Sequence, residues 1–116
     1  MLSRLSIEFN QPGQLNDDFC EDLVTLRELS LLNNKLTTLP VSGFRKLNTL
    51  NKLNLGSNQI YNVNEGIFEG LIDLNYLNLY DNNLTSLPDK LFHELHNLNT
   101  LSLSQNKLHS DVFNIS

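Results

Sequence analysis

The chain has 116 residues, a single cysteine, a net charge of −5 and a hydrophobic content of 40% that is mostly leucine. The negative charge argues against nucleic-acid binding, since phosphate recognition requires a surface rich in Lys and Arg. No apolar run approaches the ~20 residues of a membrane span, and the start, MLSRLSIEF, has neither the long apolar stretch nor the cleavage site of a signal peptide.

The sequence repeats with a period of 24 residues from Leu2 onward. The first, fourth and sixth positions of every unit are leucine or isoleucine, and the ninth is always asparagine. A unit of this size cannot bury its own leucines, so the units are expected to stack as coils of one solenoid. We therefore predict a single domain over residues 1–116, with units at 2–25, 26–49, 50–73, 74–97 and a partial fifth at 98–116.

Each unit begins with an alternating apolar pattern that predicts a short strand, and stacking places these strands side by side in one parallel β-sheet. The second half of each unit carries a phenylalanine and leucines that fill the back of the core. Because this return half is the longer one, the sheet is expected on the concave face. The convex face is expected to carry short helical or irregular segments, with Pro88–Leu95 as one candidate for a short helical turn.

The first unit departs from the pattern at Pro12, where the other units have leucine or isoleucine. We expect a rearranged loop there, followed by a short helix capped by Asn16. One arginine and five acidic residues give residues 2–25 a net charge of −4, which fits either a solvated segment or an acidic docking patch. Cys20 is expected to be a small buried side chain or a thiol whose partner lies in another chain or in a missing part of this one.

The two ends of the solenoid are expected to be open, because neither carries a cysteine-rich cap and the fifth unit stops early. An uncapped coil leaves its core side chains and its strand edge exposed. At one end these are Leu2 and Leu5, and at the other Leu98 and Leu101. We therefore predict self-association through the uncapped repeat ends.

The asparagine column is expected to be structural. It follows each strand at an inward turn, where backbone groups lose their ladder partners, and an asparagine side chain offers both a donor and an acceptor. These side chains face inward, so we do not expect them to contact a ligand. The column consists of Asn10, Asn34, Asn58, Asn82 and Asn106.

The outward strand positions vary on this fixed leucine frame, which is typical of a rigid scaffold that carries changeable contacts. Tyr76 and Tyr80 stand in one unit and form a candidate aromatic anchor for a ligand. Leu32, Lys52 and Asp81 complete the candidate ligand-binding set on the concave face. The alternative is that these are isolated surface residues without a role in binding.

No catalytic constellation is evident. His93, His96 and His109 lie on the return side or in the tail, and nothing in the pattern places them beside a serine or Cys20. The pair His93 and His96 lacks a third metal ligand, and there is no glycine-rich phosphate loop. We therefore expect no enzyme activity, no metal site and no cofactor.

The pattern LxxLxLxxNxLxxLPxxxFxxLxx resembles the typical leucine-rich repeats of animal extracellular proteins, over Leu2–Leu108, with 74–97 as the best match. The chain looks like a fragment of a Toll or Toll-like receptor ectodomain. Similar repeats occur in Slit-type proteins, in the variable lymphocyte receptors of jawless fish and in small matrix proteoglycans. The resemblance implies an α/β leucine-rich repeat solenoid of about five coils.

In function, the resemblance implies an extracellular innate-immune or developmental receptor ectodomain at the cell surface. Such a module binds a protein or pathogen-derived ligand or a co-receptor and supports receptor dimerisation, without touching the membrane itself. The alternatives are a structural or adhesion protein of the extracellular matrix and an intracellular repeat adaptor. Two glycosylation sequons, at Asn83 and Asn114, favour an extracellular host, and Asn83 is expected to be exposed.

Overall fold

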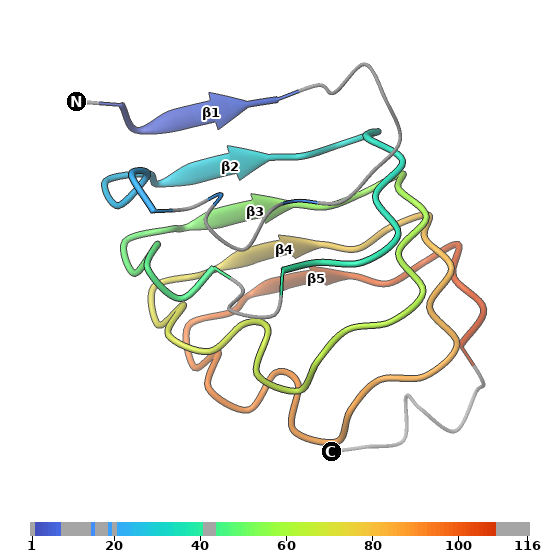
Figure 1. The fold of residues 1–116 in the computed structure, drawn as a ribbon. Coiled ribbons are helices and arrows are strands. Elements are labelled where there is room, and N and C mark those ends of the chain that lie inside the picture. Colours follow the sequence, from blue (N-terminus) through green and yellow to red (C-terminus); the bar gives the residue numbers. More distant parts are fainter. Residues whose placement is uncertain (1, 8–14, 16–18, 20, 41–43, 109–116) are drawn as a thin grey trace.

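The computed structural model describes residues 2–7, 15, 19, 21–40 and 44–108. The described part contains one sheet of five parallel strands, in which each strand pairs with the next one along the chain. Figure 1 shows the strands stacked in a row, each followed by a long return segment. The predicted parallel-sheet solenoid is therefore confirmed. The strands are β1 Arg4–Ser6, β2 Glu28–Ser30, β3 Lys52–Asn54, β4 Tyr76–Asn78 and β5 Thr100–Ser102.

The sheet register follows the period of the sequence. Leu29 of β2 lies opposite Leu53 of β3, and Leu53 lies opposite Leu77 of β4. A shift of one repeat thus superimposes equivalent residues, so every inward position meets an identical or similar side chain in the next coil. The result is a set of continuous apolar columns across the stack.

These columns form one hydrophobic core. The central leucines of the three inner strands, Leu29, Leu53 and Leu77, are at most 2% exposed. Burying a leucine side chain stabilises a fold by ~1.5–3 kcal/mol, so the columns supply most of the favourable free energy. The equivalent residues of the end strands are less covered, since Leu5 is half-buried and Leu101 is 38% exposed.

The back of the core is built from the phenylalanines of the return segments. Phe44 and Phe68 are completely buried, at no more than 1% exposure. The rings of Phe68 and Phe92 stack with their centroids 6.2 Å apart and their planes inclined by 12°. The described core is thus closed between strand leucines on one side and return-segment aromatics on the other.

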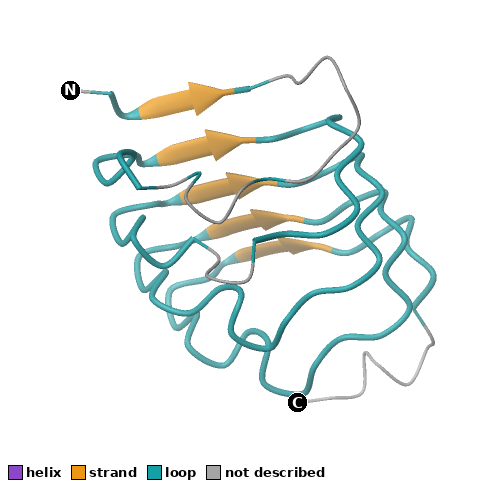
Figure 2. Cartoon of the chain, in the orientation of Figure 1, coloured by secondary structure: helices purple, strands orange, loops and turns teal. Residues whose placement is uncertain are grey.

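The described return segments consist of turns and irregular chain, without a helix (Figure 2). Pro88–Leu95, expected as a short helical turn, is a run of separate turns closed by N–H groups three residues after their acceptors. These bonds run from Leu91 to Pro88, from His93 to Lys90 and from Leu95 to Phe92. Of the two forms expected for the convex side, the irregular one is therefore present.

Several sequence-based expectations lie outside the described residues. They concern the loop after Asn10, the cap at Asn16, the environment of Cys20 and the sequon at Asn114. Among the residues that are described, none belongs to a helix with the length and apolar character needed to cross a membrane.

Candidate ligand-binding face

The outward side chains of β1–β5 and of the turns that follow them form a surface that we call the strand face. Equivalent positions of successive units form rows across this face, and the third, fifth and seventh positions give its first, second and third rows. In the first row Lys52 lies between Glu28 and Tyr76, since the register pairs these three residues. The guanidinium Nε of Arg4 lies 3.1 Å from a carboxylate oxygen of Glu28. Lys52 is exposed and makes no ion pair with any residue that the structure describes. Its ammonium group is therefore available to a ligand.

The second row contains a side-chain bridge between β3 and β4. The Nδ2 of Asn78 donates to the Oδ1 of Asn54 at 2.9 Å, and this oxygen also accepts the N–H of Gly56 at 3.0 Å. The Oδ1 of Asn78 in turn accepts the N–H of Tyr80 at 2.9 Å. Both amide groups are thus fixed in orientation. Sequence reasoning missed this bridge, although asparagine at the fifth position of two successive units was a visible signal.

The third row places two exposed apolar side chains on either side of a glycine. Leu32 is 44% exposed and Tyr80 is 42% exposed, and Gly56 occupies the equivalent position in the coil between them. A Cβ atom on Gly56 would lie 2.7 Å from the Nδ2 of Asn78 and 3.2 Å from a methyl group of Leu32. Glycine therefore fits this position by close packing, because the amide group of Asn78 and a methyl group of Leu32 already occupy the place of a side chain.

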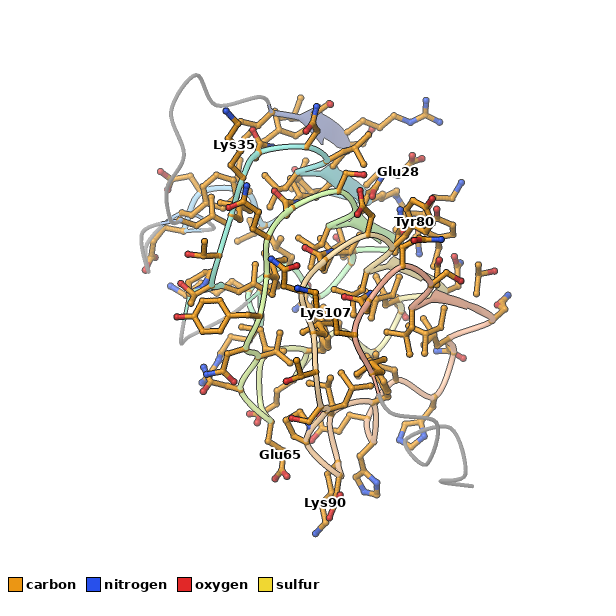
Figure 3. The ribbon with its side chains drawn as sticks, turned by 90° about the vertical axis from the view of Figure 1, so that its right-hand side faces the viewer. Glu28, Lys35, Glu65, Tyr80, Lys90 and Lys107 are labelled. Carbon is orange, nitrogen blue, oxygen red and sulfur yellow. The ribbon has the colours of Figure 1, made fainter. Side chains whose placement is uncertain are left out.

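A hollow of about 670 Å³ lies over β1–β4. Of the five predicted binding residues, Lys52 and Tyr76 line it, together with Arg4, Glu28 and Asn54. Serines at two of the other lining positions leave the space open. Leu32, Tyr80 and Asp81 lie outside this lining, further along the same coils. In Figure 3, Glu28 and Tyr80 both lie on the sheet side of the molecule, away from Glu65 and Lys90.

Asp81 belongs to a turn with unusual backbone geometry. Its φ is 60°, and its N–H donates to the carbonyl of Ser104 in the next coil at 2.9 Å. The same left-handed conformation recurs at the equivalent position of three further units, at Asn33, Ser57 and Gln105. Left-handed backbone is costly for most residues and least so for glycine, asparagine and aspartate. Asp81 thus combines an exposed carboxylate with a role in the turn.

The asparagine column lies behind the strand face. Asn34, Asn58 and Asn82 are buried, whereas Asn106 is half-buried and Asn10 lies outside the described residues. Asn58, Asn82 and Asn106 each accept a backbone N–H from the preceding coil through Oδ1, at 2.8–3.1 Å. Their Nδ2 groups donate to backbone carbonyls of their own coil and of the preceding one. The described asparagine side chains of this column are thus engaged in hydrogen bonds with the backbone.

A second polar column closes the coils at the last position of the unit, and sequence reasoning did not find it. The hydroxyl of Thr25 donates to the carbonyl of Leu2 at 2.8 Å, and that of Thr49 donates to the carbonyl of Leu26 at 2.9 Å. Asn97 makes a related bond to the carbonyl of Ile72 at 2.7 Å. The signal was present as a polar residue at the end of each full unit.

The remaining candidates lie away from the strand face. Asn83 was expected to be exposed, but it is half-buried, and its N–H donates to the carbonyl of Ile60 at 2.8 Å; Thr85 of its sequon is exposed. His93 and His96 are exposed on the return side. Within the described residues, no three or more His, Cys, Asp or Glu side chains are grouped so that they could hold a metal ion.

Comparison with known proteins agrees with this architecture. The model of the leucine rich repeat family matches residues 1–60 and 48–108, whereas a search of curated proteins gives no match. A chain in the crystal structure of the LRIM1/APL1C complex has a TM-score of 0.80 and 28% identity, over 88% of this chain and 20% of that one. A chain in the Drosophila melanogaster SNF/U2A′ complex has a TM-score of 0.70 and 27% identity, over 90% and 59%.

The chain therefore spans about a fifth of the first of these proteins and about three fifths of the second. Both structures are complexes, so proteins with similar repeats take part in protein assemblies. The matched family model covers the repeats from the first strand to the last described residue, and the chain belongs to the leucine rich repeat family.

Proposed function

We propose that the chain is a protein-binding module whose strand face contacts the partner. The observation that carries this proposal is the open hollow over β1–β4, whose lining includes the ring of Tyr76 and the ammonium group of Lys52, which pairs with no carboxylate of the described residues. Exposed aromatic and apolar side chains continue the surface at Tyr80 and Leu32. Tyrosine on a rigid backbone loses little conformational freedom on binding and is a frequent hot spot of interfaces, and leucine adds apolar contact area beside it. The chain acts in this proposal by recognition, without catalysis.

The host of this module is proposed to be an extracellular receptor ectodomain of the Toll-like kind, in innate immunity or development. The resemblance of the repeats to those receptors and the sequon at Asn83 support this assignment. A structural or adhesion protein of the extracellular matrix is the second candidate, because its repeats are similar and it would carry the same sequon. Both assignments place a protein partner on the strand face.

Site-specific photo-cross-linking tests binding at the strand face. A photoreactive phenylalanine analogue replaces Tyr80 in one variant and Tyr61, which is 56% exposed and off the strand face, in a matched control. Each chain is fused to a cleavable secretion signal, expressed in animal cells and irradiated in their culture medium. We expect a covalent adduct with a discrete protein from position 80 and none from position 61. Equal labelling at both positions, or none at position 80, would contradict the proposal.

Secretion from animal cells also tests the location. If the chain belongs outside the cell, Asn83 should carry a glycan, which peptide-N-glycosidase would remove with a measurable loss of mass. In an Asn114→Gln background, which leaves Asn83 as the one remaining sequon, Asn83→Gln should abolish that loss, while Asn62→Gln, at an exposed asparagine without a sequon, should leave it unchanged. A secreted wild-type chain of unmodified mass would count against the extracellular assignment.

Self-association through the repeat ends is a further part of the proposal. Leu2 is 52% exposed and Leu101 is 38% exposed, whereas the equivalent Leu77 of an inner strand is fully buried. Light scattering of the 116-residue chain should detect association that increases with concentration, and Leu101→Glu should reduce it. Leu32→Glu, an equal change on the strand face, should not. A wild-type chain that stays monomeric at high concentration would contradict this part.

A further inference from the structure

The strand face offers hydrogen-bond donors that no described residue uses. The Oδ1 of Asn54 is occupied by Gly56 and Asn78, while its Nδ2 donates to no residue that the structure describes. On the same strand, Lys52 has no ion-pair partner in the described part of the chain. Both side chains line the hollow. Two unoccupied donor groups thus lie two residues apart on one face of β3.

The nearby acidic side chain is engaged elsewhere. Glu28 is the neighbour of Lys52 in the register, but its carboxylate is paired with Arg4 at 3.1 Å, on the side of β1. The tyrosine on the other side, Tyr76, adds a ring and a hydroxyl. The charged residues that line the hollow are Arg4, Lys52 and Glu28, so the environment of Lys52 has one positive charge in excess, although the whole chain carries a net charge of −5.

Two exposed apolar side chains lie beside the next outward position of coil 50–73, on the two neighbouring coils. Gly56 follows Asn54 by two residues, and Leu32 and Tyr80 are exposed on either side of it. Neighbouring strands of a sheet lie ~4.8 Å apart, so about 10 Å separates the backbones that carry these two side chains. An apolar side chain of a partner can rest on the exposed surfaces of these two side chains, above the buried Gly56.

We propose that coil 50–73 binds an extended segment of the partner protein in which an acidic residue and an apolar residue are two positions apart. The carboxylate is held by Lys52 and the Nδ2 of Asn54, and the apolar side chain rests on the exposed surfaces of Leu32 and Tyr80. Residues two apart on one face of an extended segment are ~7 Å apart, which matches the spacing from Asn54 to Gly56. This inference rests on the proposed function and names the chemistry of its partner.

A long polyanion such as a nucleic acid fits this site less well than a peptide. It would have to approach a chain of net charge −5 through the single unpaired cation that we identify in the hollow. Affinity for nucleic acid requires several such cations. A single carboxylate needs one cation and one or two oriented N–H donors, which is the set present at Lys52 and Asn54.

The test is a selection of phage-displayed random dodecapeptides on the 116-residue chain, with counter-selection on Lys52→Glu. We expect enriched peptides to carry Asp or Glu two positions from Leu, Ile, Phe or Met. Synthetic copies should lose about tenfold or more in affinity when the acid becomes its amide, and similarly on Lys52→Glu. Leu32→Ser should weaken binding of the same peptides. Lys90→Glu, the same charge change at an exposed site away from the sheet, should not (Figure 3).

The other outcomes separate this inference from the proposed function. Enriched peptides without an acid, or acidic peptides that bind Lys52→Glu as well as wild type, would overturn the inference while leaving the strand face as a binding surface. Binding that survives Leu32→Ser, Tyr80→Ser and Lys52→Glu together would overturn the proposed function too, because the peptides would then occupy another face. A selection that enriches no sequence would overturn the inference. Tight binding of a single-stranded oligonucleotide that competes with the peptides would also contradict it.

Discussion

The side-chain oxygen of Asn58 lies 2.8 Å from the backbone nitrogen of Asn34, one full repeat away, and accepts its N–H. The same oxygen accepts the N–H of Leu36 at 3.1 Å, while the Nδ2 of Asn58 donates to the carbonyls of Leu31 and Leu55. One side chain thus satisfies backbone groups of two coils inside the core. This arrangement explains why the ninth position of the unit does not vary.

Asn58→Leu should therefore destabilise the centre of the stack. Leucine has a similar volume but leaves at least two N–H groups and two carbonyls without this partner, and each buried unsatisfied group costs ~1–3 kcal/mol. We expect the free energy of unfolding in urea to fall by about 3 kcal/mol or more, with loss of a single cooperative transition. Hydrogen exchange should accelerate at the amides of Asn34 and Leu36. Asn62→Leu, at an exposed site, is the control, and an unchanged melt for Asn58→Leu would disprove this account.

The second polar column, at the last position of each unit, predicts one substitution that lowers the free energy of unfolding and one that raises it. Thr49→Val removes the hydroxyl that bonds the carbonyl of Leu26 and should lower the free energy of unfolding by about 1 kcal/mol. Asp73 occupies the same position in the next unit, where an ionised carboxylate has no proton to donate. Asp73→Thr should therefore stabilise the chain by ~0.5–1.5 kcal/mol through a new bond to the carbonyl of Leu50. Thr49→Ser, which keeps the hydroxyl, should resemble wild type, and a destabilised Asp73→Thr would refute the idea.

The repeat period was sufficient to predict the sheet and its register. Because the units have equal length, Leu53 can only meet Leu29 and Leu77 if every coil is stacked in phase, as observed. Burial of apolar columns gives a large free-energy gain that no other register would match, so the pattern alone decides the fold.

The strand face was only partly predictable. Sequence placed Lys52 and Tyr76 on the outer surface, but it did not reveal the bridge from Asn78 to Asn54 or the ion pair of Arg4 and Glu28. These contacts depend on rotamers and on the spacing between coils, and their free energies are small beside that of the core. The left-handed eighth position was likewise missed, since Asn33 and Asp81 favour this conformation but Ser57 and Gln105 do not.

Gly56→Ala should be destabilising despite the small size of the added group. The new Cβ atom would lie 2.7 Å from the Nδ2 of Asn78, so the bridge to Asn54 must move. We expect a loss of ~1–3 kcal/mol in thermal or urea unfolding. Gly66→Ala is the matched control, because its nearest neighbour would be a side-chain oxygen of Glu69 at 3.4 Å.

A double mutant separates this steric cause from a general effect of the glycine. Asn78→Ser removes the amide group that blocks the Cβ atom, and serine is already present at the equivalent Ser30. In the Asn78→Ser background, Gly56→Ala should cost less than half of what it costs in the wild type. If the stability losses of Gly56→Ala and Asn78→Ser simply add in the double mutant, a contact other than the one with Asn78 causes the loss in Gly56→Ala.

Ser57 offers a test of backbone strain at the eighth position. Its φ is 51°, in the left-handed region where most L-residues are ~1–2 kcal/mol less stable than in the right-handed one. Asparagine tolerates this region better, so Ser57→Asn should raise the free energy of unfolding by about 0.5–1 kcal/mol. Ser57→Val should lower it by ~1–2 kcal/mol, because a β-branched side chain crowds this conformation further. Ser86→Asn, at an exposed site without positive φ, should change little, and an equal gain there would assign the effect of Ser57→Asn to asparagine itself instead of to relieved strain.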